Sequence, residues 1–136
     1  MPLFRLIYAS LRGSRSPRDL IDILEQSEAR NAVDAITGAL VLTPDCYLQL
    51  LEGERGVVNA CYDRVCRDPR HSHVGLILFE AVEERLFPDW SMTAVDLSEG
   101  DAIAPYTEGE EFRPEELPRA VVERLFRDVA ARLRRS

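Results

Sequence analysis

The 136-residue sequence contains no lysine: its 17 basic residues are all arginines, and 24 acidic residues bring the formal charge to −7. A protein that binds nucleic acid normally presents a basic face to the phosphates, so this balance argues against that class of partner. Several arginines gather near the C-terminus, in RLFRDVAARLRRS. This pattern is typical of the solvated face of a helix, with a nucleic-acid or lipid patch as the alternative interpretation.

Cysteine and histidine are also scarce. The three cysteines, Cys46, Cys61 and Cys66, show no C-x-x-C spacing and signal neither a disulfide framework nor a zinc site. We expect all three to be buried thiols. The two histidines, His71 and His73, lie in the stretch DPRHSH without a third ligand nearby, so we expect no metal site.

Long apolar runs and enzyme signatures are missing as well. No run approaches the roughly 20 residues of a membrane span, and the start MPLFRLIYAS lacks the features of a signal peptide. The motifs G-x-S-x-G, G-x-G-x-x-G, H-E-x-x-H and the Walker loop do not occur, which argues against common hydrolases and nucleotide-dependent enzymes. We therefore expect a cytoplasmic, non-enzymatic protein of one compact domain.

The periodicity of apolar residues predicts a ferredoxin-like α+β fold. Short runs rich in β-branched, aromatic and other apolar residues predict strands, and apolar residues that repeat at three and four positions predict helices. The turn residues Pro44 and Asp45 join two strands as a hairpin, and Pro69 limits the second helix. The predicted order β-α-β-β-α-β-β places strands at 3–10, 35–43, 46–52, 74–82 and 90–97, with helices from 17 and over 58–66. The right-handed crossover rule puts both helices on one face.

The strands are apolar at consecutive positions, which indicates that both faces of the sheet are covered. The first two helices cover only one face. The C-terminal segment has apolar residues at helical spacing, and we assign it to the second face: Val122, Leu125, Phe126, Val129 and Leu133. We therefore divide the chain into a unit that contains the sheet and the first two helices, residues 1–97, and a helical extension, residues 98–136.

Polar residues inside the apolar segments are the candidate functional residues. Tyr8 lies in the first strand, Asn31 just past the first helix and Gln49 in the third strand, while Trp90 and Met92 open the fifth strand. A buried amide such as that of Gln49 needs partners for two donors and one acceptor oxygen. Each residue also has an ordinary structural interpretation, as a strand end, a helix cap or a core side chain.

Five separated blocks resemble, in order and spacing, the BLUF family of blue-light sensors using FAD. The resemblance covers residues 3 to about 97, and no output domain follows, as in the short, stand-alone members. The glycines usual in the family's hairpin are replaced here by TPDC. The blocks are LIYAS, NAVDAITGALVL, YLQLLEGE, RDPRHSHVGLI and RLFPDWSM.

The resemblance implies a role for each candidate residue. Tyr8 and Gln49 match the photoswitch, and Trp90 with Met92 match the relay of the signal through the fifth strand. The flavin ring is expected between the two helices, pinned at its pyrimidine edge by Asn31. The residues expected to bind the cofactor, which is FAD with FMN or riboflavin as alternatives, are Tyr8, Ile23, Arg30, Asn31, Gln49, Asp68, Arg70 and His71.

In the mechanism that the resemblance implies, Tyr8 supplies an electron and a proton to the excited flavin, Gln49 rearranges, and the absorption shifts to the red. The signal would then pass to a separate effector protein or an oligomer interface, and we expect a homo-oligomer without nucleic-acid or membrane partners. Two alternatives stay open at this point. One is a flavin-free binding or scaffold protein with the same fold, and the other is a small-molecule enzyme such as an acyl-phosphate hydrolase.

Overall fold

A computed structural model describes residues 2–12, 17–69, 71–107 and 112–135, and for residues 12, 17–20 and 71 it describes the backbone only. The short 3-10 helices η1 and η2 precede the last helix. The elements are β1 (Leu3–Arg12), α1 (Pro17–Asp34), β2 (Thr37–Leu42), β3 (Cys46–Glu54), α2 (Arg55–Arg67), β4 (His71–Val82), β5 (Ala94–Asp96), η1 (Ala104–Tyr106), η2 (Pro114–Glu116) and α3 (Arg119–Arg135).

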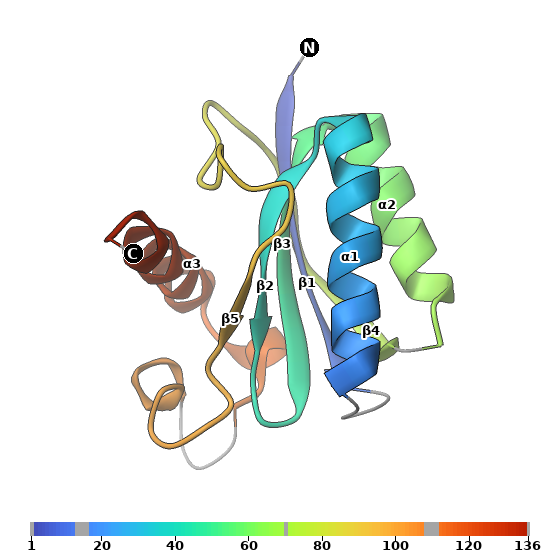
Figure 1. Ribbon diagram of the computed structural model, residues 1–136. Helices are drawn as coiled ribbons and strands as arrows, with labels where there is room; N and C mark the ends of the chain where they lie inside the picture. Colours follow the sequence, from blue (N-terminus) through green and yellow to red (C-terminus); the bar gives the residue numbers. More distant parts are fainter. Residues whose placement is uncertain (1, 13–16, 70, 108–111, 136) are drawn as a thin grey trace.

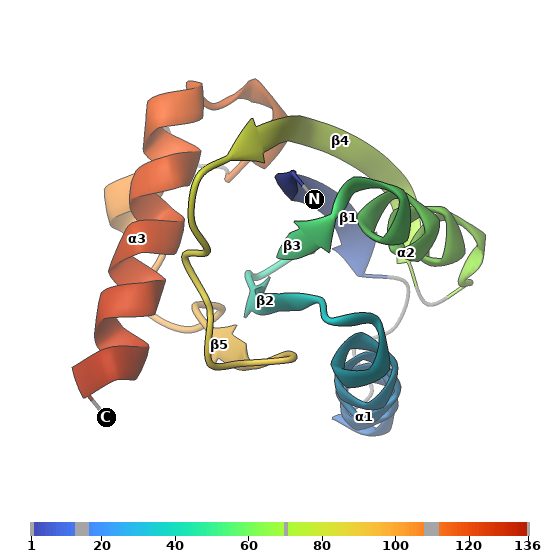
Figure 2. The same cartoon turned by 90° about the horizontal axis from the view of Figure 1, so that it is seen from above.

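The five strands form one sheet in the order β4-β1-β3-β2-β5. The pairs β1–β3, β1–β4 and β2–β3 are antiparallel, whereas β5 adds to β2 in parallel. Helices α1 and α2 cover one face and α3 covers the other (Figures 1 and 2). The predicted ferredoxin-like arrangement with a C-terminal helix on the second face is thus confirmed.

The hairpin between β2 and β3 turns at the predicted position. Thr43 N donates to Cys46 O at 3.0 Å, and Cys46 N donates to Thr43 Oγ1 at 3.0 Å. Gly38 lets the two strands approach closely, because a Cβ atom at this position would lie 1.9 Å from Leu50 O. Any side chain there would push β2 away from β3.

Strand alternation divides the core into two clusters. Ile7, Leu48 and Leu50 point toward α3, where they pack with Phe126 and its neighbours. Tyr8 and Leu51 point the other way and pack with residues of α1 and α2. The predicted inward stripe of α3 is confirmed, because Val122, Leu125, Phe126 and Val129 are buried and Leu133 packs against them.

The fifth strand is shorter than predicted, because it spans Ala94–Asp96 instead of residues 90–97. Gly38 N donates to Trp90 O at 3.0 Å and Leu40 N donates to Thr93 O at 2.8 Å. Two residues along β2 therefore face three residues of the partner segment, which interrupts the ladder as a β-bulge does. Trp90 and Met92 thus precede β5 instead of opening it.

Two smaller corrections concern β4 and the thiols. Strand β4 begins at His71 rather than at residue 74, because it pairs with β1 up to Arg12. Cys46 and Cys61 are buried as predicted, but Cys66 is exposed, so the prediction of a buried thiol was wrong at this position. Among the described residues, no helix is long and apolar enough to cross a membrane, and no three potential metal ligands gather.

Candidate functional site

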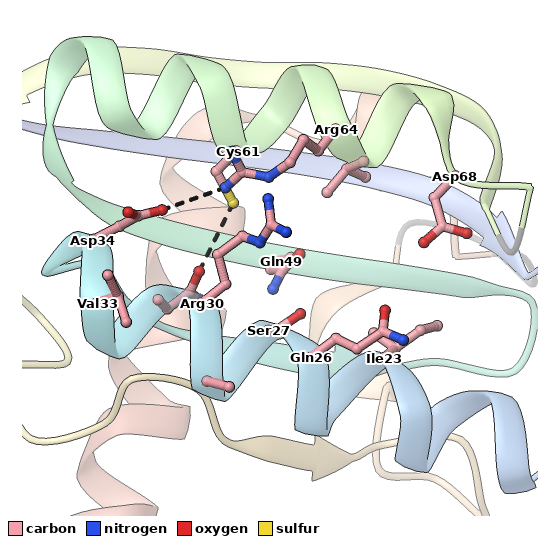
Figure 3. Close-up of a pocket in the computed structure, with 13 residues that line it drawn as sticks. Ile23, Gln26, Ser27, Arg30, Val33, Asp34, Gln49, Cys61, Arg64 and Asp68 are labelled. Atoms are coloured by element: carbon pink, nitrogen blue, oxygen red, sulfur yellow. Dashed lines mark hydrogen bonds and ion pairs between the residues drawn. The ribbon is translucent and has the colours of Figure 1, made fainter.

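A pocket of about 790 Å³ lies between α1 and α2, with Gln49 of β3 at its floor (Figure 3). Pockets of this size hold small molecules and cofactors. The two helix walls supply both apolar and polar side chains. The lining residues are Ile23, Gln26, Ser27, Ala29, Arg30, Asn31, Val33, Asp34, Gln49, Cys61, Arg64, Val65 and Asp68.

Tyr8 and Gln49 form a buried hydrogen-bonded pair beside this pocket. They are directly opposite each other in the β1–β3 register and point to the same face. The Tyr8 hydroxyl donates to Gln49 Oε1. Tyr8 is fully buried and Gln49 is 4% exposed, so water does not compete for this bond. Burial raises the pKa of the Tyr8 phenol well above its usual value of 10, with a smaller contribution from the nearby Cys61 thiol.

The other end of the Gln49 amide bonds to Met92, because Gln49 Nε2 donates to Met92 Sδ at 3.3 Å. A thioether is a weak acceptor and has no proton to donate. If the amide turned over, its oxygen would face the sulfur and no bond could form there, whereas the Tyr8 hydroxyl could accept from the amide nitrogen. The orientation of this amide therefore decides whether Met92 is bonded.

Asn31 lies inside α1, three residues before its end, and not past the helix as the sequence pattern suggested. Ala35 adopts a left-handed backbone with φ 56°, and Ile36 N donates to Asn31 O at 2.9 Å. This is the Schellman arrangement, in which the stop residue is normally glycine. An alanine at that position hid the helix end from sequence analysis.

The buried Asn31 amide connects the pocket to the segment before β5. Asn31 Nδ2 donates to Ser91 O at 3.0 Å, and Asn31 Oδ1 accepts from Cys61 Sγ at 3.9 Å. Ser91 and Met92 are the residues in the bulge opposite β2. The two site amides, of Asn31 and Gln49, therefore hold two consecutive residues of this segment.

Trp90 faces away from the pocket. It packs with the cluster on the α3 side, and its ring lies 6.3 Å from that of Phe87 in an edge-on arrangement. Phe87 in turn lies 6.3 Å from Phe126 of α3. Of the two predicted relay residues, Met92 contacts the Gln49 amide. Trp90 contacts Phe87, which in turn packs against Phe126 of α3.

Two arginines extend over the pocket from opposite helices, Arg30 from α1 and Arg64 from α2 (Figure 3). Arg64 Nη2 forms an ion pair with Asp34 Oδ2 at 3.5 Å and makes no shorter hydrogen bond among the described residues. Sequence reasoning missed Arg64, although a signal was available. Cys61, Arg64 and Asp68 are spaced at 0, 3 and 7 residues, which places them on one face of α2.

The thiol and the second phenol near the site are held in their neutral forms. Burial raises the pKa of Cys61, against the opposing effect of the Arg64 charge. The Tyr62 ring centroid lies 5.6 Å from that of Tyr8. Burial, together with a hydrogen bond to Cys66, raises the pKa of Tyr62 to about 12. The floor of the site is therefore uncharged at neutral pH.

Of the residues predicted to bind the cofactor, Ile23, Arg30 and Asp68 line the pocket together with Asn31 and Gln49. Ile23 is 5% exposed and lies on the wall formed by α1. Arg70 lies outside the described residues. The side chain of His71 does as well, so neither enters the description of the site.

The pocket fits a planar aromatic cofactor with an anionic tail. Its walls include the apolar side chains of Ile23 and Val65, and the two buried amides supply donors and acceptors. The guanidinium groups of Arg30 and Arg64 can donate to a polar tail. A ferredoxin-like sheet with such a pocket beside a buried Tyr–Gln pair defines a cofactor-binding domain.

The family description "Sensors of blue-light using FAD" matches residues 3–93, and the chain belongs to this family, BLUF. The predicted resemblance is confirmed, and with it a blue-light-sensing domain that binds a flavin. Neither the flavin-free scaffold nor the acyl-phosphate hydrolase is supported.

Individual relatives agree with this assignment. The chain is 35% identical over 77 residues to the photoactivated adenylate cyclase subunit beta of Euglena gracilis, a match that covers 56% of this chain but only 9% of the relative's length. Two solved structures resemble nearly the whole chain. BlrB, described as a BLUF protein in its dark state, has a TM-score of 0.81 at 32% identity over 96% of each chain. BlsA in its photo-activated state has a TM-score of 0.84 at 28% identity over 94% of each chain.

Proposed function

We propose that this protein is a blue-light switch in which Tyr8 and Gln49 control whether the Gln49 amide is hydrogen-bonded to Met92. The observation that carries the proposal is the buried chain of contacts from the Tyr8 hydroxyl through the Gln49 amide to Met92 Sδ. All three groups lie beside a pocket large enough for a flavin. The chain's own part is to convert a proton movement at one phenol into a changed contact at a thioether.

A bound flavin would supply light absorption and a light-driven electron acceptor. The α1 and α2 walls would hold its ring, and Asn31 and Gln49 would bond its polar edge. Because the Tyr8 hydroxyl already donates to Gln49 Oε1, a proton that leaves this phenol has an acceptor in place. A buried phenol with a raised pKa stays protonated in the dark, so the Tyr8 hydroxyl still carries its proton when light arrives.

The lit state would differ from the dark state in the sense of the Gln49 amide. Rotation or tautomerisation of a carboxamide exchanges donor and acceptor while its shape is kept. The bond to Met92 Sδ would then be lost, since neither the amide oxygen nor the sulfur carries a proton. Individual bonds of this kind contribute about 0.5–1.5 kcal/mol, which is enough to shift a population between two nearly balanced states.

We propose FAD as the resident flavin, with Arg30, Arg64 and Asp68 at the open side of the pocket toward its polar tail. Two guanidinium groups favour an anionic tail over the neutral one of riboflavin. Denaturing the purified protein and separating the released flavin by chromatography would identify it. Release of riboflavin alone would contradict the assignment.

We further propose that residues 1–97 form a sensor without enzymatic activity of its own, and that residues 98–136 form the output side. Support comes from the route from Met92 and Trp90 through Phe87 to Phe126 on α3. A downstream effector protein or a second copy of the chain would then read a change in α3.

The test compares absorption spectra of the flavin-loaded protein before and after blue light. Wild type is expected to show a reversible red shift. Tyr8→Phe and Gln49→Leu are expected to remain yellow but to lose the shift, because the first removes the proton donor and the second removes the group that rearranges. Tyr62→Phe is the matched control. The Tyr62 ring lies next to that of Tyr8, but the substitution leaves the Tyr8–Gln49 hydrogen bond in place. A normal shift in either site variant would contradict the proposed switch.

A further inference from the structure

Glu52 is a fully buried carboxylate near the end of β3, on the sheet face that α3 covers. Its oxygens accept from Leu86 N at 2.9 and 3.0 Å and from Phe87 N at 3.0 Å. Arg5 on β1 donates to it through Nε at 2.9 Å. A buried carboxylate is strongly unfavourable unless it is paired in this way. The backbone that follows β4 is therefore tied to the centre of the sheet.

Arg85 ties the same segment to α1 and β2. Its Nη1 donates to Thr37 Oγ1 at 2.7 Å and to Glu52 O at 2.9 Å, and its Nη2 donates to Ala35 O at 2.9 Å. Ala35 directly follows α1, the helix that carries Asn31. The segment 84–87 is thus bonded to three other elements.

The far end of the same connection is bonded to the two site amides and to the backbone of β2, and it carries no charged anchor among the described residues. Asn31 Nδ2 bonds Ser91 O and Gln49 Nε2 bonds Met92 Sδ. Trp90 lies between the two ends and packs against Phe87. In Figure 2 this connection runs from β4 to β5 along the side of the sheet that faces α3. One end is fixed by charged groups, whereas the bonds of the other end include the Gln49–Met92 contact that the proposed switch breaks.

We propose that Glu52 and Arg85 are positioning residues for the light signal, because they hold segment 84–87 still while residues 91 and 92 move. With the segment fixed, a displacement at Met92 must change how Trp90 and Phe87 pack against Phe126 of α3. With the segment loose, the turn itself takes up the displacement and α3 does not respond. This inference rests on the proposed switch and adds the part that directs its output.

The test uses Glu52→Gln, which keeps the side-chain volume but replaces one acceptor oxygen by a donor. Hydrogen exchange of the flavin-free protein is measured first, and the Leu86 and Phe87 amides are expected to exchange about tenfold faster, as the loss of a buried hydrogen bond predicts. Glu83→Gln is the matched control, because Glu83 is an exposed carboxylate in the same turn. Arg85→Met is a second, independent variant.

The flavin-loaded proteins are then compared in the dark and under blue light. Both anchor variants are expected to keep the red shift, while the light-induced change in hydrogen exchange of α3 falls at least about threefold relative to wild type and Glu83→Gln. An unchanged α3 response in either folded anchor variant would overturn the inference, as would a red-shifting wild type without any α3 response. Absence of the red shift in wild type would instead refute the proposed switch itself.

Discussion

The two faces of the sheet are built from the same strands but differ in kind. Toward α3 the buried side chains are apolar and interlock, as Phe87 and Phe126 do at 6.3 Å between their ring centroids, with the carboxylate of Glu52 near the end of β3 as the exception. Toward α1 and α2 the core includes Tyr8 and Gln49, and it opens into a pocket of about 790 Å³. One face is filled by its own helix, whereas the other leaves room for a cofactor.

The comparison separates stability from signalling. A close-packed apolar face gains free energy from every buried side chain, about 1.5–3 kcal/mol for a large one. A face with buried amides and an open pocket gains less, because each polar group must find a partner. Successive residues of a strand point to opposite faces, so Ile7 packs in the cluster beneath α3 while its neighbour Tyr8 lies in the cluster beside the pocket.

The largest expected effect concerns the α3 face. Phe126→Ala should lower the free energy of unfolding by about 3–5 kcal/mol, because it removes a fully buried ring and leaves a cavity. Val33→Ala, on the pocket side, should change it by less than about 0.5 kcal/mol, since Val33 is 86% exposed. Urea unfolding of the flavin-free proteins measures both values. Equal losses would mean that the α3 face is not the main source of stability.

The next effect concerns the pocket face. Asn31→Ala should weaken flavin binding about 10- to 100-fold. It removes the amide that we propose bonds the polar edge of the flavin, together with the bonds to Ser91 O and Cys61 Sγ that position this amide. Fluorescence titration of the flavin-free protein with FAD would measure the dissociation constant. Glu28→Ala, an exposed change on the same helix, should leave the constant unaltered. Unchanged affinity in the Asn31 variant would remove this residue from the binding site.

A third prediction uses alkaline pH. The pKa of Tyr8 is raised by burial, so the unfolded phenol ionises first, near pH 10, while the folded one stays neutral. The unfolded state therefore binds fewer protons above that pH, and stability that is fully present below about pH 10 falls as the pH rises. Tyr8→Phe should make this fall shallower. The check is urea unfolding between about pH 8 and pH 11, and identical slopes in both proteins would contradict the assignment.

The smallest effect concerns the thiols. Cys66→Ser should change the free energy of unfolding by less than about 0.5 kcal/mol, because Cys66 is exposed. In the native protein a thiol reagent should modify Cys66 rapidly and Cys46 and Cys61 slowly, since burial shields these two and raises the pKa of each. Mass spectrometry after brief labelling would identify the modified residue. Rapid labelling of Cys61 would mean that the pocket floor is open to solvent.

Local patterns in the sequence were sufficient for the order of helices and strands along the chain, the hairpin at Pro44 and Asp45 and the inward stripe of α3. Each depends on periodicity or on turn chemistry, which act over a few residues. The same patterns misplaced Asn31, because an alanine takes the left-handed position after α1 where glycine is the usual signal. They also extended the fifth strand to Trp90, since the bulge at residues 91 and 92 arises from pairing with β2, which is distant in sequence.

The sequence by itself determined which residues could form a switch, because a phenol and two amides inside apolar segments require buried partners. Tertiary structure alone decided what those partners are. The β1–β3 register sets Tyr8 opposite Gln49, and the bulge before β5 brings Met92 to the amide and Ser91 to Asn31. It also decided that Glu52 and Arg85 anchor one segment, since residues up to 79 positions apart meet there. Such meetings depend on how strands are ordered in the sheet, and no local pattern encodes that order.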